Sequence, residues 1–219
     1  MSNQTETVFL ADKQVWLMPD LIVKRKQQIL NVTAKQFREK GYAASSMRDI
    51  ATELGIEAAS LYHHIKSKDE LLQTICFGMA DKFITALEEV NDIYFNAEEK
   101  LRMAIHNHVQ IMTENPDQSV VFLNEWRSLQ EPHLTGYKKL RDQYENEIRL
   151  IIEHGRDEDI FADVDTKFAT LTILSAVNWI YQWYDPNGSM TPSEVATKLS
   201  DFILGGLRKK LVTDLNYKP

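Results

Sequence analysis

Side chains suited to contacting nucleic acid are concentrated in one short stretch of the sequence, residues 46–68. Ser60, Tyr62 and His63 carry hydroxyl and imidazole groups that can hydrogen-bond to the edges of base pairs. Glu57 adds a carboxylate, which can accept a hydrogen bond from cytosine. Phosphate oxygens are contacted by hydroxyl groups and cations, and the stretch supplies Ser46, Arg48, Lys66 and Lys68. These residue types predict contact with double-stranded DNA.

Two marked helix starts frame this stretch. Ser46 and Asp49 fit the capping-box pattern, in which a hydroxyl and a carboxylate each take a free backbone N–H group at a helix start. Ser67 and Glu70 repeat the pattern. Gly55 stands between them, where a helix would end with a residue at positive φ, which glycine adopts without a steric penalty. The pattern predicts a helix from Ser46 that ends near Gly55.

The segment from Glu57 to Ile65 is expected to form a second helix with two unlike faces. Leu61 and Ile65 are four residues apart and share an apolar edge, whereas the base-reading candidates face away from it. Two short helices joined by a tight glycine turn make a helix-turn-helix, whose second helix enters the major groove of DNA. An αα-hairpin inside a helical bundle would contain a similar turn.

The distribution of charge favours the DNA-binding interpretation. Residues 24–68 hold nine Lys/Arg and four Asp/Glu, a net charge of +5, although the whole chain carries −7. The remainder is therefore at −12. Affinity for phosphates depends on the local basic face rather than on the average charge.

The residues that form this pattern resemble the TetR family of one-component transcriptional repressors. The matching positions are Ile29-Leu30, Ala34, Phe37, Gly41-Tyr42, Ser46, Ile50-Ala51, Leu54-Gly55-Ile56, Leu61-Tyr62, Ile65, Ser67-Lys68 and Leu71-Leu72. The resemblance implies a ligand-responsive DNA-binding regulator whose remaining residues form an all-helical ligand-binding and dimerisation domain. Nothing in these residues distinguishes a repressor from an activator.

The start of the second helix departs from the family pattern. Glu57 occupies a position that is commonly a small hydroxyl residue, and Ala58 and Ala59 supply no hydrogen-bond donors. Glu57 suits the positive end of the helix dipole but repels phosphate. The departure motivates an alternative, in which the chain is an all-α small-molecule-binding or enzymatic bundle whose head does not bind DNA.

Along the whole chain, helical periodicity and breaks at Gly and Pro predict an all-α fold. We expect an N-terminal arm at 1–19, a three-helix DNA-binding head at 20–66 and a six-helix ligand-binding and dimerisation domain at 67–219. The six helices are expected at about 67–90, 96–115, 116–129, 131–155, 165–184 and 191–211.

The last two predicted helices carry more apolar residues than the surface of a monomer tolerates. The helix at 165–184 is apolar nearly all round, and the helix at 191–211 adds an apolar stripe. The first of them could simply be the central helix of a monomeric core. The family resemblance instead implies a homodimer in which these two helices from each chain form a four-helix bundle.

The same resemblance implies a cavity for a small effector. Met112, Trp126, Tyr144, Phe168 and Trp179 are large side chains on the helices that surround the cavity in this fold, and Asn178 adds a polar group. Apolar walls with few polar groups suit an apolar or amphipathic effector.

The C-terminal string from Asn178 to Gly188 resembles a TetR subgroup that responds to acyl-CoA thioesters. The phosphates of such a ligand would need cations. Candidates for this role are Arg102, Arg127, Lys138, Lys139, Arg141 and Arg149.

No catalytic, metal or cofactor motif is recognisable in the sequence. His106 and His108 are two residues apart, whereas metal-binding pairs on helices favour spacings of three or four. The single cysteine, Cys76, excludes an intrachain disulfide. No stretch has the length and apolarity of a membrane span. We therefore expect a cytoplasmic, non-enzymatic protein without a cofactor.

Overall fold

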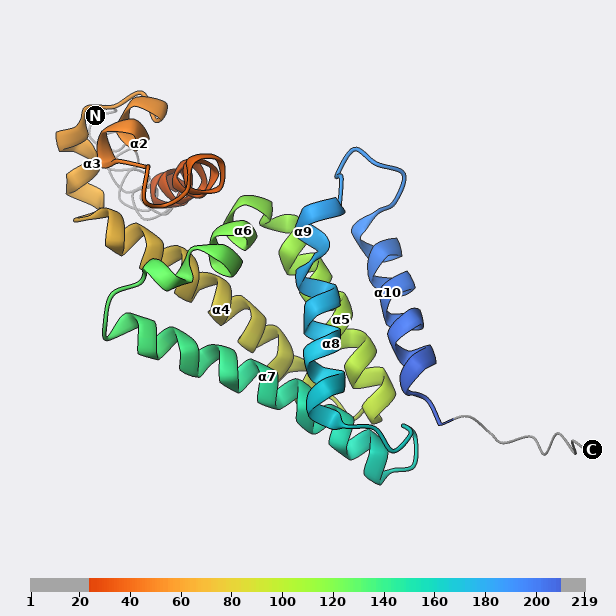
Figure 1. Cartoon of the computed structure of the whole chain (residues 1–219). Coiled ribbons are helices and arrows are strands. Elements are labelled where there is room, and N and C mark those ends of the chain that lie inside the picture. The colour runs from red at the N-terminus through yellow and green to blue at the C-terminus, as the bar shows by residue number, and fades with distance from the viewer. Residues whose placement is uncertain (1–23, 210–219) are drawn as a thin grey trace, which may run out of the picture.

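The computed structural model describes residues 24–209, so the predicted arm at 1–19 lies outside the described residues. Within 24–209 the fold is all-α, as predicted, and the single β-type contact is an isolated bridge between Phe161 and Arg208 (Figure 1). The elements are a first helix described over 24–40, α2 (Met47–Glu53), α3 (Ala58–His64), α4 (Lys68–Asp92), α5 (Ala97–Glu114), α6 (Pro116–Asn124), a 3₁₀ turn η1 (Trp126–Ser128), α7 (His133–Asp157), α8 (Thr166–Asn178), α9 (Ile180–Trp183) and α10 (Pro192–Leu207). None of the described helices is long and apolar enough to cross a membrane.

The head is the helix-turn-helix that the capping signals predicted. Ser46 and Asp49 form a complete capping box at the start of α2. Gly55 adopts φ 65°, which lets the chain turn between α2 and α3. The second predicted capping box, at Ser67 and Glu70, has only one of its two hydrogen bonds. The Ser67 hydroxyl accepts the N–H of Glu70, but the Glu70 carboxylate accepts the N–H of Lys66, one residue before the expected position.

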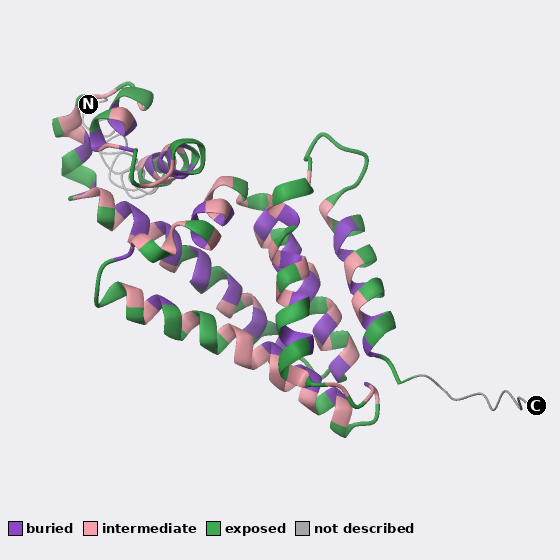
Figure 2. Cartoon of the chain, viewed as in Figure 1, coloured by how far each residue is buried: buried purple, intermediate pink, exposed green. Residues whose placement is uncertain are grey.

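The apolar core of the head continues into the body. One cluster joins Ile29 and Phe37 of the first helix and Ile50 of α2 to buried residues of α4, α6 and α7. A second cluster is built from α5, α7, α8 and α10. The predicted domain boundary falls at the start of α4, and one continuous apolar cluster crosses it. Buried residues recur along the whole of α4 (Figure 2).

The helix expected at 165–184 is two helices, so the described body has seven α-helices rather than the six predicted. The break falls at Trp179, whose N–H is shared between the carbonyls of Ser175 and Val177. Neither Gly nor Pro marks this position in the sequence, so no local signal predicted it. The helix expected at 116–129 likewise ends at Asn124 and continues as the short turn η1.

Candidate DNA-binding surface and effector cavity

The outer face of α3 presents the side chains that were predicted to read bases. The Tyr62 side chain is 51% exposed and His63 is also exposed, whereas Leu61 and Ile65 are fully buried beneath them. Ser60 is half-buried. Glu57 is exposed at the N-cap of α3 and makes no capping hydrogen bond, so its carboxylate is available at the end of the helix.

Two of the four predicted phosphate contacts are engaged in holding the head together. The Ser46 hydroxyl donates to Asp49 Oδ2 at 2.6 Å and accepts the Asp49 N–H at 3.2 Å. This hydrogen bond holds the pKa of the Asp49 carboxyl below its usual value. The Lys68 ammonium donates to the carbonyls of Tyr42 and Ser45, both at 2.9 Å. Ser46 and Lys68 therefore also have structural roles, and their contact with phosphate stays a prediction.

Lys68 belongs to a joint between the head and α4 that sequence reasoning missed. Its ammonium lies 4.3 Å from the centre of the Tyr42 ring, within range of a cation–π contact. The Tyr42 hydroxyl in turn donates to the carboxylate of Asp69, the next residue of α4. Arg48 and Lys66, in contrast, are exposed and stay candidates for phosphate contact.

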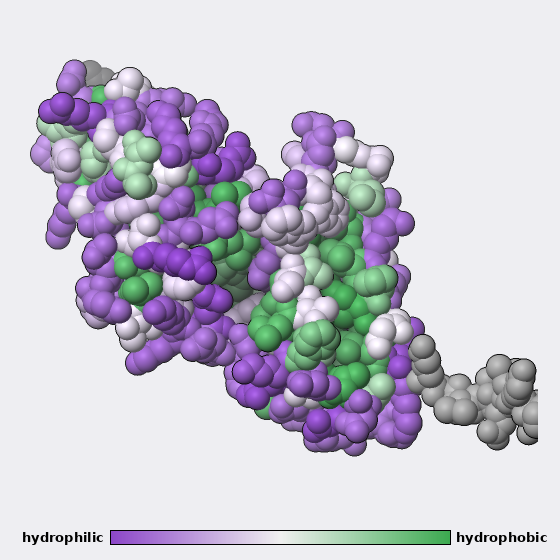
Figure 3. All heavy atoms as spheres, in the orientation of Figure 1, coloured by the Kyte–Doolittle hydropathy of each residue, from purple (hydrophilic) through white to green (hydrophobic). Residues whose placement is uncertain are grey.

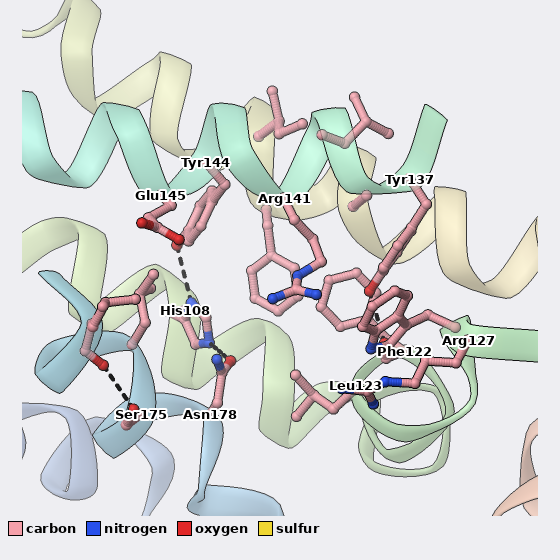
Figure 4. Close-up of a pocket in the computed structure, with 17 residues that line it drawn as sticks. His108, Phe122, Leu123, Arg127, Tyr137, Arg141, Tyr144, Glu145, Ser175 and Asn178 are labelled. Atoms are coloured by element: carbon pink, nitrogen blue, oxygen red, sulfur yellow. Dashed lines mark hydrogen bonds between the residues drawn. The ribbon is translucent and has the colours of Figure 1, made fainter. Parts of the chain in front are cut away.

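A cavity of about 280 Å³ opens in the body among α4, α5, α6, η1, α7 and α8 (Figure 4). Of the six residues predicted to line a pocket, Trp126, Tyr144 and Asn178 do so. The other lining residues are Ala80, Phe83, Ile84, His108, Phe122, Leu123, Arg127, Tyr137, Leu140, Arg141, Glu145, Leu171, Leu174 and Ser175.

Met112, Phe168 and Trp179 do not line this cavity, and the prediction is corrected at these three positions. Met112 is buried in the cluster that joins the head to the body. The side chains of Phe168 and Trp179 are 70% and 59% exposed. On a helix of 3.6 residues per turn, the face of α8 toward the cavity is set by residues such as Leu174 and Asn178, and Phe168 lies further round the helix.

A chain of polar groups crosses one wall of the cavity. His108 of α5 contacts residues of two other helices. Its Nδ1 atom lies 3.0 Å from the hydroxyl oxygen of Tyr144 on α7, and its Nε2 atom lies 3.1 Å from Oδ1 of Asn178 on α8. Because Asn178 Oδ1 can only accept, Nε2 carries the proton and Nδ1 accepts from the Tyr144 hydroxyl. Burial lowers the pKa of His108 to about 4 and raises that of Tyr144. These three hydrogen-bonded side chains, Tyr144, His108 and Asn178, which we call the polar relay, are therefore uncharged at neutral pH.

Two arginines stand at another part of the cavity without carboxylate partners. The guanidinium groups of Arg127 and Arg141 lie 4.4 Å and 4.8 Å from the centre of the Trp126 ring, and neither forms an ion pair within the described residues. Arg102, by comparison, pairs with Asp201 at 2.7 Å and does not line the cavity. The cations available to an anionic ligand in the cavity are thus Arg127 and Arg141.

Helix α6 contacts both the cavity and the DNA-binding head. Its residues Phe122 and Leu123 line the cavity. At its other end, Asp117 forms an ion pair of 2.6 Å with Arg38 of the first helix. The Gln118 amide also donates to Asn31 of that helix, at 3.1 Å. The short helix α6 therefore joins the cavity wall to the head, in addition to α4, which lines the cavity and packs against the head.

The outer faces of α8 and α10 expose large apolar side chains. Phe202 of α10 is 83% exposed, and Phe168, Leu171 and Trp179 are also open to solvent. Figure 3 shows apolar residues gathered over α8 and toward α10. Exposed apolar patches of this kind mark interaction surfaces.

Comparison with known proteins places both parts of the chain in one family. Residues 29–75 match the family described as "Bacterial regulatory proteins, tetR family". Residues 95–207, which are more than half of the chain, match the "Tetracyclin repressor-like, C-terminal domain".

Similar proteins extend the match over most of the chain. The transcriptional repressor KstR2 of Mycobacterium tuberculosis is 26% identical over 191 residues, 85% of this chain and 94% of its own. Its solved structure superposes with a TM-score of 0.81, covering 85% of this chain and 96% of that chain. PfmR of Thermus thermophilus is 35% identical with a TM-score of 0.75, over 83% and 99% of the two chains.

A third solved structure combines ligand and DNA. AibR, in complex with isovaleryl coenzyme A and operator DNA, is 26% identical with a TM-score of 0.72, over 81% of this chain and 97% of its own. Together with the helix-turn-helix and the cavity joined to it by α6, these matches show that the chain belongs to the TetR family of bacterial transcriptional regulators.

Proposed function

We propose that the protein is a homodimeric repressor that is released from its operator when a small effector fills the cavity. The observation that carries this proposal is the position of α6, which lines the cavity through Phe122 and Leu123 and is bonded to the first helix through Asp117 and Gln118. An effector that shifts α6 changes the position of the head, and with it the fit to DNA.

The outer face of α3 supplies the base contacts in this proposal. Tyr62 and His63 are exposed on a helix whose inner face is fixed by Leu61. Arg48 and Lys66 supply contacts to the phosphates of the DNA, because both are exposed and neither side chain is paired with a carboxylate among the described residues. Phosphate contacts position a protein on DNA and base contacts specify the sequence.

The exposed faces of α8 and α10 form the dimer interface in this proposal. Burying Phe168, Trp179 and Phe202 against the same face of a second copy removes the largest apolar side chains of these helices from water. A twofold dimer also presents two copies of α3 to DNA, and helix-turn-helix dimers bind half-sites separated by one helical turn, about 34–36 Å.

The effector class that the cavity supports is an acyl-CoA thioester. Phe83, Phe122 and Leu174 supply apolar walls for an acyl body, and Arg127 and Arg141 supply unpaired cations for an anionic group. AibR, a structural neighbour, is seen with isovaleryl coenzyme A.

Release from DNA is described as a shift between two populations. An effector changes the equilibrium only by as much as its affinity differs between the DNA-competent and DNA-incompetent arrangements. Because α6 and α4 both border the cavity and contact the head, the two arrangements would differ in the angle between the head and the body. No catalytic step enters this proposal, since the buried His108 is engaged by Tyr144 and Asn178.

The proposal is tested by fluorescence anisotropy with DNA fragments from beside the protein's own gene. We expect sequence-selective binding with a submicromolar Kd that weakens as the salt concentration rises, as phosphate contacts require. Acetyl-, isovaleryl-, octanoyl- and palmitoyl-CoA are then added to the complex, and at least one of them should release the DNA. Equal weak binding to every fragment would instead favour a ligand-binding bundle without DNA recognition.

A further inference from the structure

The polar relay includes one residue of the cavity wall, Asn178, whose amide N–H pair is not used within the relay. Asn178 Oδ1 is occupied by His108, but the Asn178 amide nitrogen has no hydrogen-bond partner among the described residues. Asn178 also lines the cavity (Figure 4). A polar group inside a largely apolar pocket fixes the orientation of a ligand, because leaving the group unpaired costs free energy.

In the structure the oxygen of the Asn178 amide, rather than its nitrogen, lies against His108. An asparagine side chain can rotate by half a turn and exchange its oxygen for its nitrogen. With Oδ1 placed 3.1 Å from His108 Nε2, the Nε2–H group donates to Asn178 and Nδ1 accepts from the Tyr144 hydroxyl. This arrangement leaves the N–H pair of Asn178 for a ligand.

We infer that Asn178 donates a hydrogen bond to an uncharged carbonyl oxygen of the effector. This inference rests on the proposed function, because it specifies the chemistry of the ligand in the same cavity. A carbonyl oxygen is a pure acceptor and matches an N–H pair. The relay carries no net charge, so it does not compensate a carboxylate, whereas Arg127 and Arg141 are available for an anion elsewhere in the cavity.

We assign this carbonyl to the acyl end of the effector, where either the thioester carbonyl or a keto group within the acyl body can supply it. The amide carbonyls of the pantetheine arm are common to every acyl-CoA and produce no difference among the ligands compared below. Three ligands separate these sources: octanoyl-CoA, S-octyl-CoA, which lacks the thioester carbonyl, and 7-oxooctanoyl-CoA, which carries an additional ketone. Their Kd values are measured by isothermal titration with the full-length protein.

The variant Asn178→Asp keeps the size of the side chain and replaces the N–H pair by an oxygen. Ser175→Ala is the matched control, because Ser175 also lines the cavity but donates its hydroxyl to the Leu171 carbonyl at 2.7 Å. Circular dichroism and Tm establish that both variants fold. The comparison of ligands on the wild-type protein requires no substitution and stands even if Asn178→Asp does not fold.

If the thioester carbonyl is the acceptor, the wild-type protein and Ser175→Ala are expected to bind octanoyl-CoA about 5- to 20-fold more tightly than S-octyl-CoA, as one hydrogen bond in a pocket provides. If a ketone is the acceptor, the same preference is expected for 7-oxooctanoyl-CoA over octanoyl-CoA. Asn178→Asp should lose this preference. Equal affinity of the wild-type protein for all three ligands would overturn the inference and leave the effector class intact. A preference that persists in Asn178→Asp would also overturn it. Failure of the wild-type protein to bind any of the three would overturn the inference together with the thioester assignment.

Discussion

Arg38 of the first helix and Asp117 of α6 form an ion pair of 2.6 Å that joins the DNA-binding head to the wall of the effector cavity. Removing the ion pair by Arg38→Ala should make the release of DNA less sensitive to the effector, with only a small loss in the free energy of unfolding. Both side chains are partly exposed, and pairs of this kind contribute about 0.2–1 kcal/mol. The effector concentration for half-maximal release of DNA should therefore change by up to about fivefold.

The matched control for this prediction is Lys35→Ala. Lys35 also lies on the first helix and forms an ion pair, but its partner is Glu53 of α2, which belongs to the head. Anisotropy titrations of effector into the DNA complex compare the two variants. An equal change in both would contradict a specific role for the contact with α6.

Tyr62→Ala should lower operator affinity without unfolding the protein. The ring is 51% exposed on the outer face of α3, so its removal opens no cavity in the core. Side-chain contacts to base edges contribute about 1–3 kcal/mol each, which corresponds to at least about a fivefold loss of affinity. The control is Tyr94→Ala, because Tyr94 is fully exposed in the loop after α4, away from the head. If both variants bound the operator as the wild type does, α3 would not read DNA through Tyr62.

Two glycine substitutions should change stability in opposite directions. A Cβ on Gly155 of α7 would lie 2.2 Å from the Phe161 ring, and overpacking of this kind costs about 1–3 kcal/mol. A Cβ on Gly78 of α4 would meet nothing within 4 Å, and alanine stabilises a helix by up to about 1 kcal/mol relative to glycine. Urea unfolding of Gly155→Ala and Gly78→Ala measures both effects. A neutral Gly155→Ala would show that Phe161 is not packed against α7.

The burial of His108 predicts a loss of stability in acid. Its pKa is about 4 in the folded protein and 6.5 without burial, so between these values the unfolded chain takes up a proton that the folded protein does not. The contribution of this pKa difference to the free energy of unfolding is fully present above pH 6.5. It is lost as the pH falls toward 4, by up to about 3 kcal/mol. Unfolding free energies of the wild type and His108→Asn are compared across this range. Parallel pH dependences would contradict the assignment of the effect to His108.

The elements with local signals were predictable from the sequence, and the polar relay in the wall of the cavity was not. Ser46, Asn96 and Thr191 each complete a capping box at the start of a helix that was expected near that residue, and such a signal is local because the box involves residues only three apart. The partners of His108 are 36 and 70 residues away, and no local pattern reports such a contact.

The misassigned pocket residues have the same cause. Phe168 and Trp179 are large and apolar, which fits a cavity wall as well as an exposed interaction surface. Only the rotation of α8 about its axis separates the two, and the packing of α5 and α7 against it sets that rotation. The contacts of Lys68 with the carbonyls of Tyr42 and Ser45 were likewise not predictable from a local pattern, because these partners are 26 and 23 residues away.

Native mass spectrometry of the protein bound to its operator tests most directly whether occupancy of the cavity controls DNA binding. We expect a protein dimer on the DNA, and after addition of the active acyl-CoA a dimer that carries the ligand and no DNA. Ligand-loaded dimers that stay on the operator in the same proportion as ligand-free dimers would contradict this control of DNA binding by the cavity.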